Sequence, residues 1–521
     1  MPGSVSDTYD VAIIGGGHNG LTAAAYLAQA GKRVIVLERL DHVGGAAVSA
    51  DAFEGIDARL SRYSYLVSLL PKKIIRDLGL NISLIRRRYS SYTPVPGGSG
   101  GLLVDNGDPA ATARSFAGVG AASDADAWGR FYDGTAHLGR TLFPTVTEPL
   151  LTRSEARAAV GDDALWNDFI ERPIGEAIEA TFSNDLVRGV VLTDALIGTF
   201  APNIDDTLAA SRCFLYHVIG NQTGDWDVPV GGMGAVTGEL YSAARRAGAQ
   251  IVTGAEVTAL SPDGDVSYVL DGHTGTLGAD VILANVAPAV LEGLLSGPTP
   301  PRPEGAQVKV NLLLSRLPKM LDDSVAPEAA FGGTFHINET WSQLSEAHSA
   351  ASAGNVPDPL PCEIYCHSLS DPSILSPELR ASGAQTITVF GLHVPDRLVT
   401  EENNDAMRAE LTTAAVASLD SVLAEPIESL LLTDVAGNPT IEAKTTLDLE
   451  HALGMPGGNI FHGPLSWPFA EDDAELGTPA ARWGVATRHP RILLCGSGAQ
   501  RGGAVSGLGG HNAAMAVLEG H

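Results

Sequence analysis

The chain has 521 residues, and its 33 Lys and Arg stand against 61 Asp and Glu, for a formal net charge of −28. Such an acidic protein repels phosphate backbones, which excludes nucleic acid as the leading partner. Apolar residues make up 44% and charged residues 18%, so the chain has enough apolar residues for a large core and is not disordered as its main state. Length alone predicts about three domains of ordinary size, or fewer if the domains are interleaved.

Cysteine content and the absence of long apolar runs exclude further classes of protein. Cys213, Cys362, Cys366 and Cys495 are too few for a disulfide framework and lack the C-x-x-C spacing of a redox or zinc pair. We therefore expect buried small side chains and no metal site. No apolar stretch reaches the ~18 residues that span a bilayer, and residues 1–10 lack the regions of a secretory signal. The sequence predicts a cytoplasmic protein without an integral span; peripheral membrane contact and the oligomeric state stay open.

The first forty residues predict a strand–helix–strand unit. Residues 11–14 form a short apolar run, residues 21–30 place apolar side chains at helical spacing, and residues 33–37 form a second apolar run. Gly31 is a typical stop for the intervening helix. The crossover between the two parallel strands should be right-handed.

A glycine-rich turn lies inside this unit. Gly15, Gly17 and Gly20 follow the first strand as G-x-G-x-x-G, and Glu38 ends the second strand. The first glycine permits the tight turn, the second lets the backbone approach a pyrophosphate, and the third lets the helix pack on the strand. The helix N-terminus offers unpaired N–H groups to phosphates, while Glu38 can accept hydrogen bonds from the ribose hydroxyls and would repel a 2′-phosphate. This context predicts a dinucleotide site that disfavours NADP.

The fingerprint continues beyond Glu38. Arg39 can pair with a phosphate or cover the adenosine, and Gly44 and Gly45 let the backbone pass close to the pyrophosphate or flavin. With this extension, residues 11–45 resemble the FAD-binding fingerprint of the FAD-dependent amine oxidase and phytoene desaturase superfamily. The similarity is greatest to its phytoene dehydrogenase-related branch, which includes the pyridine nucleotide-disulphide oxidoreductase domain-containing proteins of animals.

Three later stretches carry the same resemblance. Residues 228–234 (VPVGGMG) resemble the start of the second FAD-domain segment, and residues 456–463 (PGGNIFHG) and 495–514 resemble motifs of that branch. The last stretch departs from the usual pattern, because Ala-Gln-Arg stands in its middle. In the family this part of the motif contains a histidine beside the flavin, and its role cannot be carried over to this chain. Arg501 would instead place a charge beside the flavin.

The resemblance and the segment pattern together give the expected fold class. It is α/β, a Rossmann-like FAD-binding domain of the glutathione reductase type with an inserted α+β substrate domain. The FAD-binding domain is assigned to residues 1–60, 225–300 and 485–521, and the substrate-binding domain to residues 61–224 and 301–484.

The resemblance also implies FAD as cofactor and a set of FAD contacts. Val257 would lie where the family's backbone grips the adenine. The last helix, expected from Gly510 to Leu518, would direct its positive end at the flavin and stabilise the anionic reduced form after hydride transfer to N5. The residues assigned to cofactor binding are Gly15, Gly17, His18, Asn19, Gly20, Glu38, Arg39, Gly44, Gly45, Ala46, Val257, Gly496, Gly498, Gly507 and Asn512.

No catalytic acid or base can be assigned from the sequence. His336, His393, His462 and His511 are candidates, although each such residue is more often structural. Hydride abstraction by a flavin mainly needs positioning and exclusion of water, so a base is not essential.

The leading hypothesis is an FAD-dependent oxidoreductase of the desaturase type, which transfers hydride from a small lipophilic substrate, such as a polyene or isoprenoid, to flavin N5. A second hypothesis keeps FAD and performs carotenoid-type isomerisation. Flavin amine oxidation is a third, disfavoured because aromatics are only 6% of the chain and none lies in the C-terminal glycine-rich motif. A non-enzyme alternative is a prenyl-binding chaperone of the Rab escort type, against which the complete fingerprint with Glu38 argues.

Overall fold

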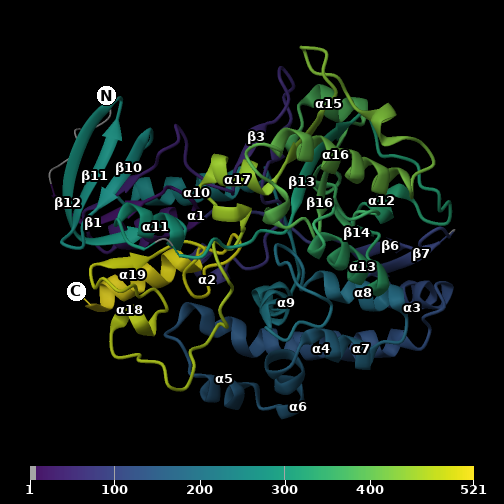
Figure 1. Cartoon of the computed structure of the whole chain (residues 1–521), viewed down its shortest axis with the longest axis horizontal. Coiled ribbons are helices and arrows are strands. Elements are labelled where there is room, and N and C mark those ends of the chain that lie inside the picture. The colour runs from purple at the N-terminus through teal and green to yellow at the C-terminus, as the bar shows by residue number, and fades with distance from the viewer. Residues whose placement is uncertain (1–7, 99, 299, 521) are drawn as a thin grey trace.

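The computed structural model describes residues 8–98, 100–298 and 300–520. In this part of the chain, two seven-stranded sheets dominate the architecture. Figure 1 shows the first sheet on the left, the second at the upper right, and a layer of helices below the second. Among the described residues, no helix combines the length and the apolar character that a membrane span requires.

The first sheet is a Rossmann-type sheet with an antiparallel extension. Its strands β9, β2, β1, β12 and β18 are parallel neighbours in that order, and β10 and β11 continue from β12 as an antiparallel meander. The chain order reverses between β1 and β12, which is where open α/β sheets bind ligands. The bounds are β1 (Thr8–Ile14), β2 (Val34–Leu37), β9 (Gln250–Val252), β10 (Ala255–Leu260), β11 (Asp265–Leu270), β12 (His273–Ala284) and β18 (Ile492–Leu494).

Alternate side chains of this sheet enter two different cores. Val11 and Ile13 pack on the face covered by α1 (His18–Gln29), α10 (Met233–Arg246) and α19 (Leu508–Gly520), whereas Ala12 and Ile14 face the meander and α11 (Pro288–Leu294). Because both faces are covered, the central strands are continuous apolar runs rather than alternating ones.

The second sheet has the order β17-β13-β16-β15-β14-β6-β7, antiparallel except for the β14–β6 pair. Four short strands form two small ribbons, β3–β4 and β5–β8. Along the sequence, these strands fall between the strands of the two large sheets. The bounds are β3 (Ser49–Asp51), β4 (Arg59–Ser61), β5 (Leu84–Ile85), β6 (Tyr89–Pro94), β7 (Gly101–Asp105), β8 (Val228–Pro229), β13 (Val308–Leu314), β14 (Thr334–Ile337), β15 (Cys362–Tyr365), β16 (Gln385–Gly391) and β17 (Ile441–Lys444).

Helices from the middle of the chain form the lower layer in Figure 1. It comprises α3 (Pro109–Gly118), α4 (Asp124–Leu142), α5 (Arg153–Val160), α6 (Asp163–Trp166), α7 (Ile174–Thr181), α8 (Asp185–Thr193) and α9 (Ala209–Ile219). The remaining helices are α2 (Lys72–Asp77), α12 (Pro327–Ala330), α13 (Trp341–Ser352), α14 (His367–Ser370), α15 (Pro377–Ser382), α16 (Asn404–Asp420), α17 (Thr446–Leu453) and α18 (Pro479–Arg482).

The mixed α/β architecture confirms the predicted fold class. The first sheet takes its strands from residues 8–37, 250–284 and 492–494, so it is assembled from three separated stretches. The domain boundaries given above stay a prediction, and residues 1–7 of the first segment lie outside the described residues.

The last helix differs from the expectation, because α19 begins at Leu508 and not at Gly510. The glycines lie inside it because neighbouring backbone leaves no room for a side chain: a Cβ on Gly510 would lie 1.9 Å from the Asn19 carbonyl oxygen. Close packing therefore outweighs the low helix propensity of glycine.

Candidate functional site

A cavity of about 640 Å³ lies between the two sheets. One wall is formed at the carboxyl ends of β1 and β2, by residues that include Gly15 and Glu38. We call it the first-sheet wall. The opposite wall is formed by residues of β13–β16, among them Lys309 and Glu363, together with Asp194 at the end of α8 and Arg87 before β6, and we call it the second-sheet wall. The cavity thus begins at the point where the order of the first sheet reverses.

The glycines of the first-sheet wall fit the roles expected of them. Gly15 has a φ of +101°, and a Cβ there would lie 2.7 Å from the Asn285 carbonyl oxygen. A Cβ on Gly20 would lie 2.3 Å from the Gly15 carbonyl oxygen. Both positions therefore require glycine, the first for its backbone conformation and the second for the approach of α1 to the turn.

The N-terminus of α1 faces the cavity without a cap. Gly17 is its N-cap, no side chain caps the helix, and its first turn holds no acidic residue. Asn19 lines the cavity and is only 1% exposed, yet neither Nδ2 nor Oδ1 has a hydrogen-bond partner. A buried amide without a partner costs free energy, so these atoms fit a polar ligand at this place. The free N–H groups and the helix dipole favour an anion.

Glu38 is fixed beside this turn. Its Oε2 accepts a hydrogen bond from the Gly16 N–H at 2.7 Å, and its Oε1 accepts one from the Leu40 N–H at 2.9 Å. Each carboxylate oxygen keeps a second lone pair, so Glu38 can still accept from a ligand. The neighbouring Arg39 donates from Nη2 to the carbonyl oxygens of His451 and Ala452, where α17 ends.

Most of the residues assigned to cofactor binding from the sequence lie on the cavity. Those that line it are Gly15, Gly17, His18, Asn19, Glu38, Arg39, Gly45, Ala46 and Val257. Six others lie behind its lining, namely Gly20, Gly44, Gly496, Gly498, Gly507 and Asn512. Whether any of these residues contacts a cofactor stays a prediction.

Two of the residues that do not line the cavity, Gly507 and Asn512, hold the C-terminal motif against neighbouring elements. Gly507 lies against Thr22 of α1, and Gly509 of α19 lies against the Cys495 and Gly496 carbonyls. Asn512 donates from Nδ2 to the Val146 carbonyl at 3.2 Å. The backbone just before α19, at residues 503–505, is the part of the C-terminal motif that reaches the cavity, together with Ser497.

Arg501 does not bring a charge into the cavity, contrary to the expectation. Its guanidinium is 2% exposed and donates to the carbonyl oxygens of Thr145, Glu148 and Trp483 at 2.8–3.1 Å. These carbonyls lie in or next to the short helix η1 (Phe143–Thr147) and next to α18, and neither their residues nor Arg501 line the cavity. Burial lowers the Arg501 pKa to about 10, so the group stays a cation at neutral pH.

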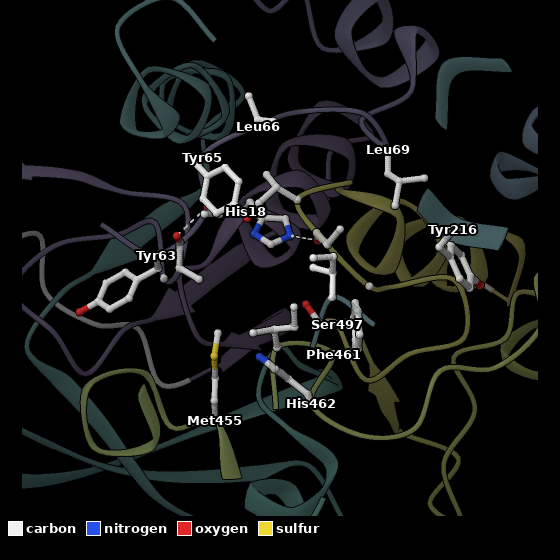
Figure 2. Close-up of a pocket in the computed structure, with 18 of the residues that line it drawn as sticks. His18, Tyr63, Tyr65, Leu66, Leu69, Tyr216, Met455, Phe461, His462 and Ser497 are labelled. Atoms are coloured by element: carbon white, nitrogen blue, oxygen red, sulfur yellow. Dashed lines mark hydrogen bonds between the residues drawn. The ribbon is translucent and has the colours of Figure 1, made fainter. Parts of the chain in front are cut away.

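Two histidines point into the cavity from different elements, as Figure 2 shows. His18, in the first turn of α1, donates from Nε2 to the Ala504 carbonyl at 3.1 Å. His462 has a φ of +64°, and its Nδ1 has no partner. Burial lowers the pKa of both imidazoles to about 4, so both are neutral at pH 7. Tyr65 and Phe461 lie beside them in the same view.

The other histidines named from the sequence divide between the walls and the core. His336 lines the cavity on the second-sheet wall, whereas His393 and His511 do not reach it. His393 packs edge-on against Phe200, with ring centroids 5.8 Å apart. His511 lies edge-on to Tyr26 at 5.1 Å, and neither histidine is placed to meet a ligand in this cavity.

The second-sheet wall holds titratable groups that the sequence analysis missed. Burial raises the pKa of Asp194 to about 8 and that of Glu363 to about 7. The Tyr365 hydroxyl donates to Glu363, and the Arg87 guanidinium lies 5.9 Å from the Tyr365 ring centroid. The wall that faces the dinucleotide turn is therefore polar, and the carboxyl groups of Asp194 and Glu363 lie among the basic side chains of Arg87 and Lys309.

Lys309 was also missed, although a signal for it exists. It is 2% exposed within β13, whose other residues are apolar or amide, and a lysine in so apolar a strand must find partners inside the protein. Its Nζ donates to the carbonyl oxygens of Ser61 and Tyr63 at 2.8 and 2.7 Å and lies 4.9 Å from the Tyr65 ring centroid. Burial holds its pKa well below the usual range.

Comparisons with known proteins agree with this geometry. Residues 13–72 match the family model of an NAD(P)-binding Rossmann-like domain. A solved putrescine oxidase variant shares the fold, with a TM-score of 0.55 at 18% identity over 98% of this chain and 99% of that chain. The rat pyridine nucleotide-disulfide oxidoreductase domain-containing protein 2 is 28% identical over 99% of this chain and 94% of its own.

A mycobacterial relative is similar over the full length. The uncharacterized protein Rv0897c of Mycobacterium tuberculosis is 56% identical over 522 residues, covering 98% of this chain and 97% of its own. The rat relative agrees with the resemblance to the pyridine nucleotide-disulphide oxidoreductase domain-containing proteins, and the phytoene desaturase-like part of that resemblance stays a prediction. The chain belongs to the family of Rv0897c, carries an NAD(P)-binding Rossmann-like domain and shares the fold of putrescine oxidase.

Proposed function

We propose that this protein binds FAD along the cavity and oxidises a lipophilic substrate at the second-sheet wall. The observation that carries the proposal is the continuity of one cavity from the uncapped N-terminus of α1 to the second sheet. The unpartnered Asn19 amide and the turn at Gly15, which a Cβ would obstruct, fit a pyrophosphate at the near end.

Each part of the first-sheet wall has a proposed task. The Asn19 amide and the first N–H groups of α1 would hold the pyrophosphate, Glu38 would accept from the ribose hydroxyls, and Val257 of β10 would lie against the adenine. The chemistry that FAD supplies when bound is acceptance of a hydride at flavin N5. His18 and His462 would border that region as neutral hydrogen-bonding groups, because their lowered pKa values keep positive charge away at pH 7.

The substrate class is proposed from the remaining lining. Leu66, Leu69 and Phe390 provide apolar contact, and such lining excludes water from the reacting carbon. Asp194 and Glu363 would meet a polar end of the substrate. We therefore propose a polyene- or isoprenoid-type substrate that carries one polar group.

Amine oxidation is the second candidate, and the carboxylates of the second-sheet wall favour it. A protonated amine would be stabilised by Asp194 and Glu363, whose pKa values are raised by burial in the cavity wall. The fold shared with putrescine oxidase is compatible with such chemistry but does not by itself assign it.

Anaerobic mixing of the purified holoprotein with both substrate classes separates the two candidates. If an isoprenoid alcohol or polyene bleaches the oxidised-flavin absorbance while primary amines do not, the proposal holds. Bleaching by amines alone would replace it with amine oxidation. If neither class reduces a flavin that dithionite does reduce, redox turnover of both classes is wrong.

A further inference from the structure

Three ionisable side chains meet on the second-sheet wall, on one face of two adjacent strands. His336 of β14 and Glu363 of β15 are direct cross-strand partners, so their side chains stand on the same side of the sheet. Glu339 follows β14 three residues after His336. Strand register therefore places His336 and Glu363 side by side, and the short connection after β14 brings in Glu339.

The geometry of this cluster brings three metal-ligating atoms together. His336 Nδ1 lies 2.6 Å from Glu339 Oε2 and 3.9 Å from Glu363 Oε1, and one ligand atom from each residue lies within 4.8 Å of the others. The side chains of His336, Glu339 and Glu363 are 6%, 0% and 3% exposed. All three are thus held in the protein interior, close enough to share one ion.

A second observation points to a missing ligand. Glu339 Oε1, the other oxygen of the carboxylate that contacts His336, is buried and has no hydrogen-bond partner. A buried carboxylate oxygen without a donor is costly, and a cation held between the two carboxylates would remove that cost. The hydroxyl of Tyr365 already donates to Glu363, whereas no donor in the described chain serves Glu339 Oε1.

We propose that His336, Glu339 and Glu363 form a Zn²⁺ site with an open position toward the cavity. One imidazole nitrogen with two carboxylates is a donor set for zinc, whereas Mg²⁺ and Ca²⁺ prefer oxygen alone. His336 and Glu363 line the cavity and the buried Glu339 does not, so an ion held by all three would be accessible from the cavity side. Three protein ligands and one open position are the arrangement in which zinc binds an oxygen of water or substrate. This site shares Glu363 with the proposed substrate contact, but it does not depend on the proposed flavin chemistry.

Calorimetric titration of Zn²⁺ into chelator-stripped protein, with the chelator removed, tests the site. The expected result is one bound ion per chain, retained on washing with metal-free buffer and on addition of FAD. Glu339→Gln and Glu363→Gln should each weaken Zn²⁺ binding by roughly tenfold or more, because outer-shell losses alone cost that much at known metal sites. Asp225→Asn is the matched control: it removes a carboxylate that lines the same cavity but pairs with Arg86, and should leave the affinity unchanged.

Circular dichroism and flavin content are measured on the same samples, so a misfolded variant is recognised. Binding of Mn²⁺, followed by loss of the free-ion electron spin resonance signal, gives a second readout that the same two variants should abolish. The proposal is overturned if stripped wild-type protein with normal flavin content takes up no Zn²⁺. It is equally overturned if both Gln variants bind as tightly as wild type. Loss of flavin with Zn²⁺ binding intact would instead count against the proposed function alone.

Discussion

At the scale of single residues, the first-sheet wall is organised by local sequence and the second by distant pairing. Glu38 reaches Gly16 and Leu40, all within the first forty residues. Lys309, in contrast, depends on the carbonyls of Ser61 and Tyr63, which are almost 250 positions away. This difference decides which substitutions test the cofactor and which test the fold.

Glu38→Arg should remove bound FAD. The change deletes the ribose acceptor and the partner of the Gly16 N–H, and it adds a cation at the turn. We expect the affinity for FAD to fall roughly tenfold or more, where each factor of ten corresponds to about 1.4 kcal/mol of binding free energy. The amount of flavin per chain should fall accordingly. The measurement is the ratio of flavin to protein absorbance after gel filtration. Glu38→Gln, which keeps one acceptor oxygen, should lose less, and stoichiometric FAD in Glu38→Arg would show that the site is misplaced.

Arg501→Met should weaken the fold and leave the flavin spectrum unchanged. The substitution leaves the carbonyls of Thr145, Glu148 and Trp483 without their donor, at a cost on the order of 3 kcal/mol. Urea unfolding followed by circular dichroism measures this loss. A shifted flavin spectrum with unaltered stability would mean that the guanidinium acts on the cofactor instead.

The sequence could predict the site residues that depend on local spacing, but not those that only the tertiary fold brings together. Gly15, Gly17 and Glu38 were predictable because their spacing and flanking apolar runs are local. Asp194 and Glu363 were not, because only the tertiary fold places them on one wall. Arg501 was noticed as an unusual residue, but the direction in which its guanidinium points depends on carbonyl oxygens more than 350 positions earlier in the chain.

At the scale of elements, α1 packs closely against the end of β1 beside the first-sheet wall. A Cβ on Gly20 would approach the Gly15 carbonyl oxygen to 2.3 Å and Asn285 Nδ2 to 2.7 Å. Asn285, which follows β12, donates from Nδ2 to that same carbonyl at 2.9 Å. The turn is thus fixed by two strands and one helix at once.

Gly20→Ala should therefore destabilise the protein by about 1–3 kcal/mol through overpacking. Gly238→Ala is the matched control, because Gly238 is an exposed residue of α10 and a Cβ added there would have nothing within 4 Å. The free energy of unfolding of the control should increase by up to about 1 kcal/mol, because alanine has a higher helix propensity than glycine. Denaturant unfolding of both variants is the check, and equal stability changes would contradict the packing account.

Element boundaries were predicted less well than element types. The helix after the glycine-rich turn, the strand at residues 11–14 and the terminal helix were all expected, because apolar periodicity is a strong local signal. The start of α19 was placed two residues late, since glycine has low helix propensity and the packing of Gly510 against α1 is a tertiary effect.

At the scale of the whole molecule, one cavity joins two sheets that are drawn from alternating parts of the chain. The first sheet was foreseeable as three separated stretches, because each contains its own strand signal. The polar character of the opposite wall was not, because it arises only when β14, β15 and the end of α8 are brought together.

The pH dependence of stability should report on that wall. Burial raises the pKa of Asp194 to about 8, so from its ordinary value up to that pH the folded state holds a proton that the unfolded chain has released. The free energy of unfolding therefore falls as pH rises through this window, and the stabilisation is complete only at low pH. Asp194→Asn removes the titration. The Tm of this variant minus the Tm of wild type should increase as the pH is raised from about 5.5 to about 8.5. A difference that does not change with pH would contradict the assignment.

The most direct test of the account is the identity of the cofactor in the protein as purified. Native mass spectrometry, together with the visible spectrum of the intact chain, measures it. The account predicts oxidised-flavin absorbance and an adduct with the mass of FAD in about equal amount to the protein, as expected for a single dinucleotide site. A protein that carries no flavin after reconstitution with FAD, or that holds a nicotinamide dinucleotide in its place, would contradict it.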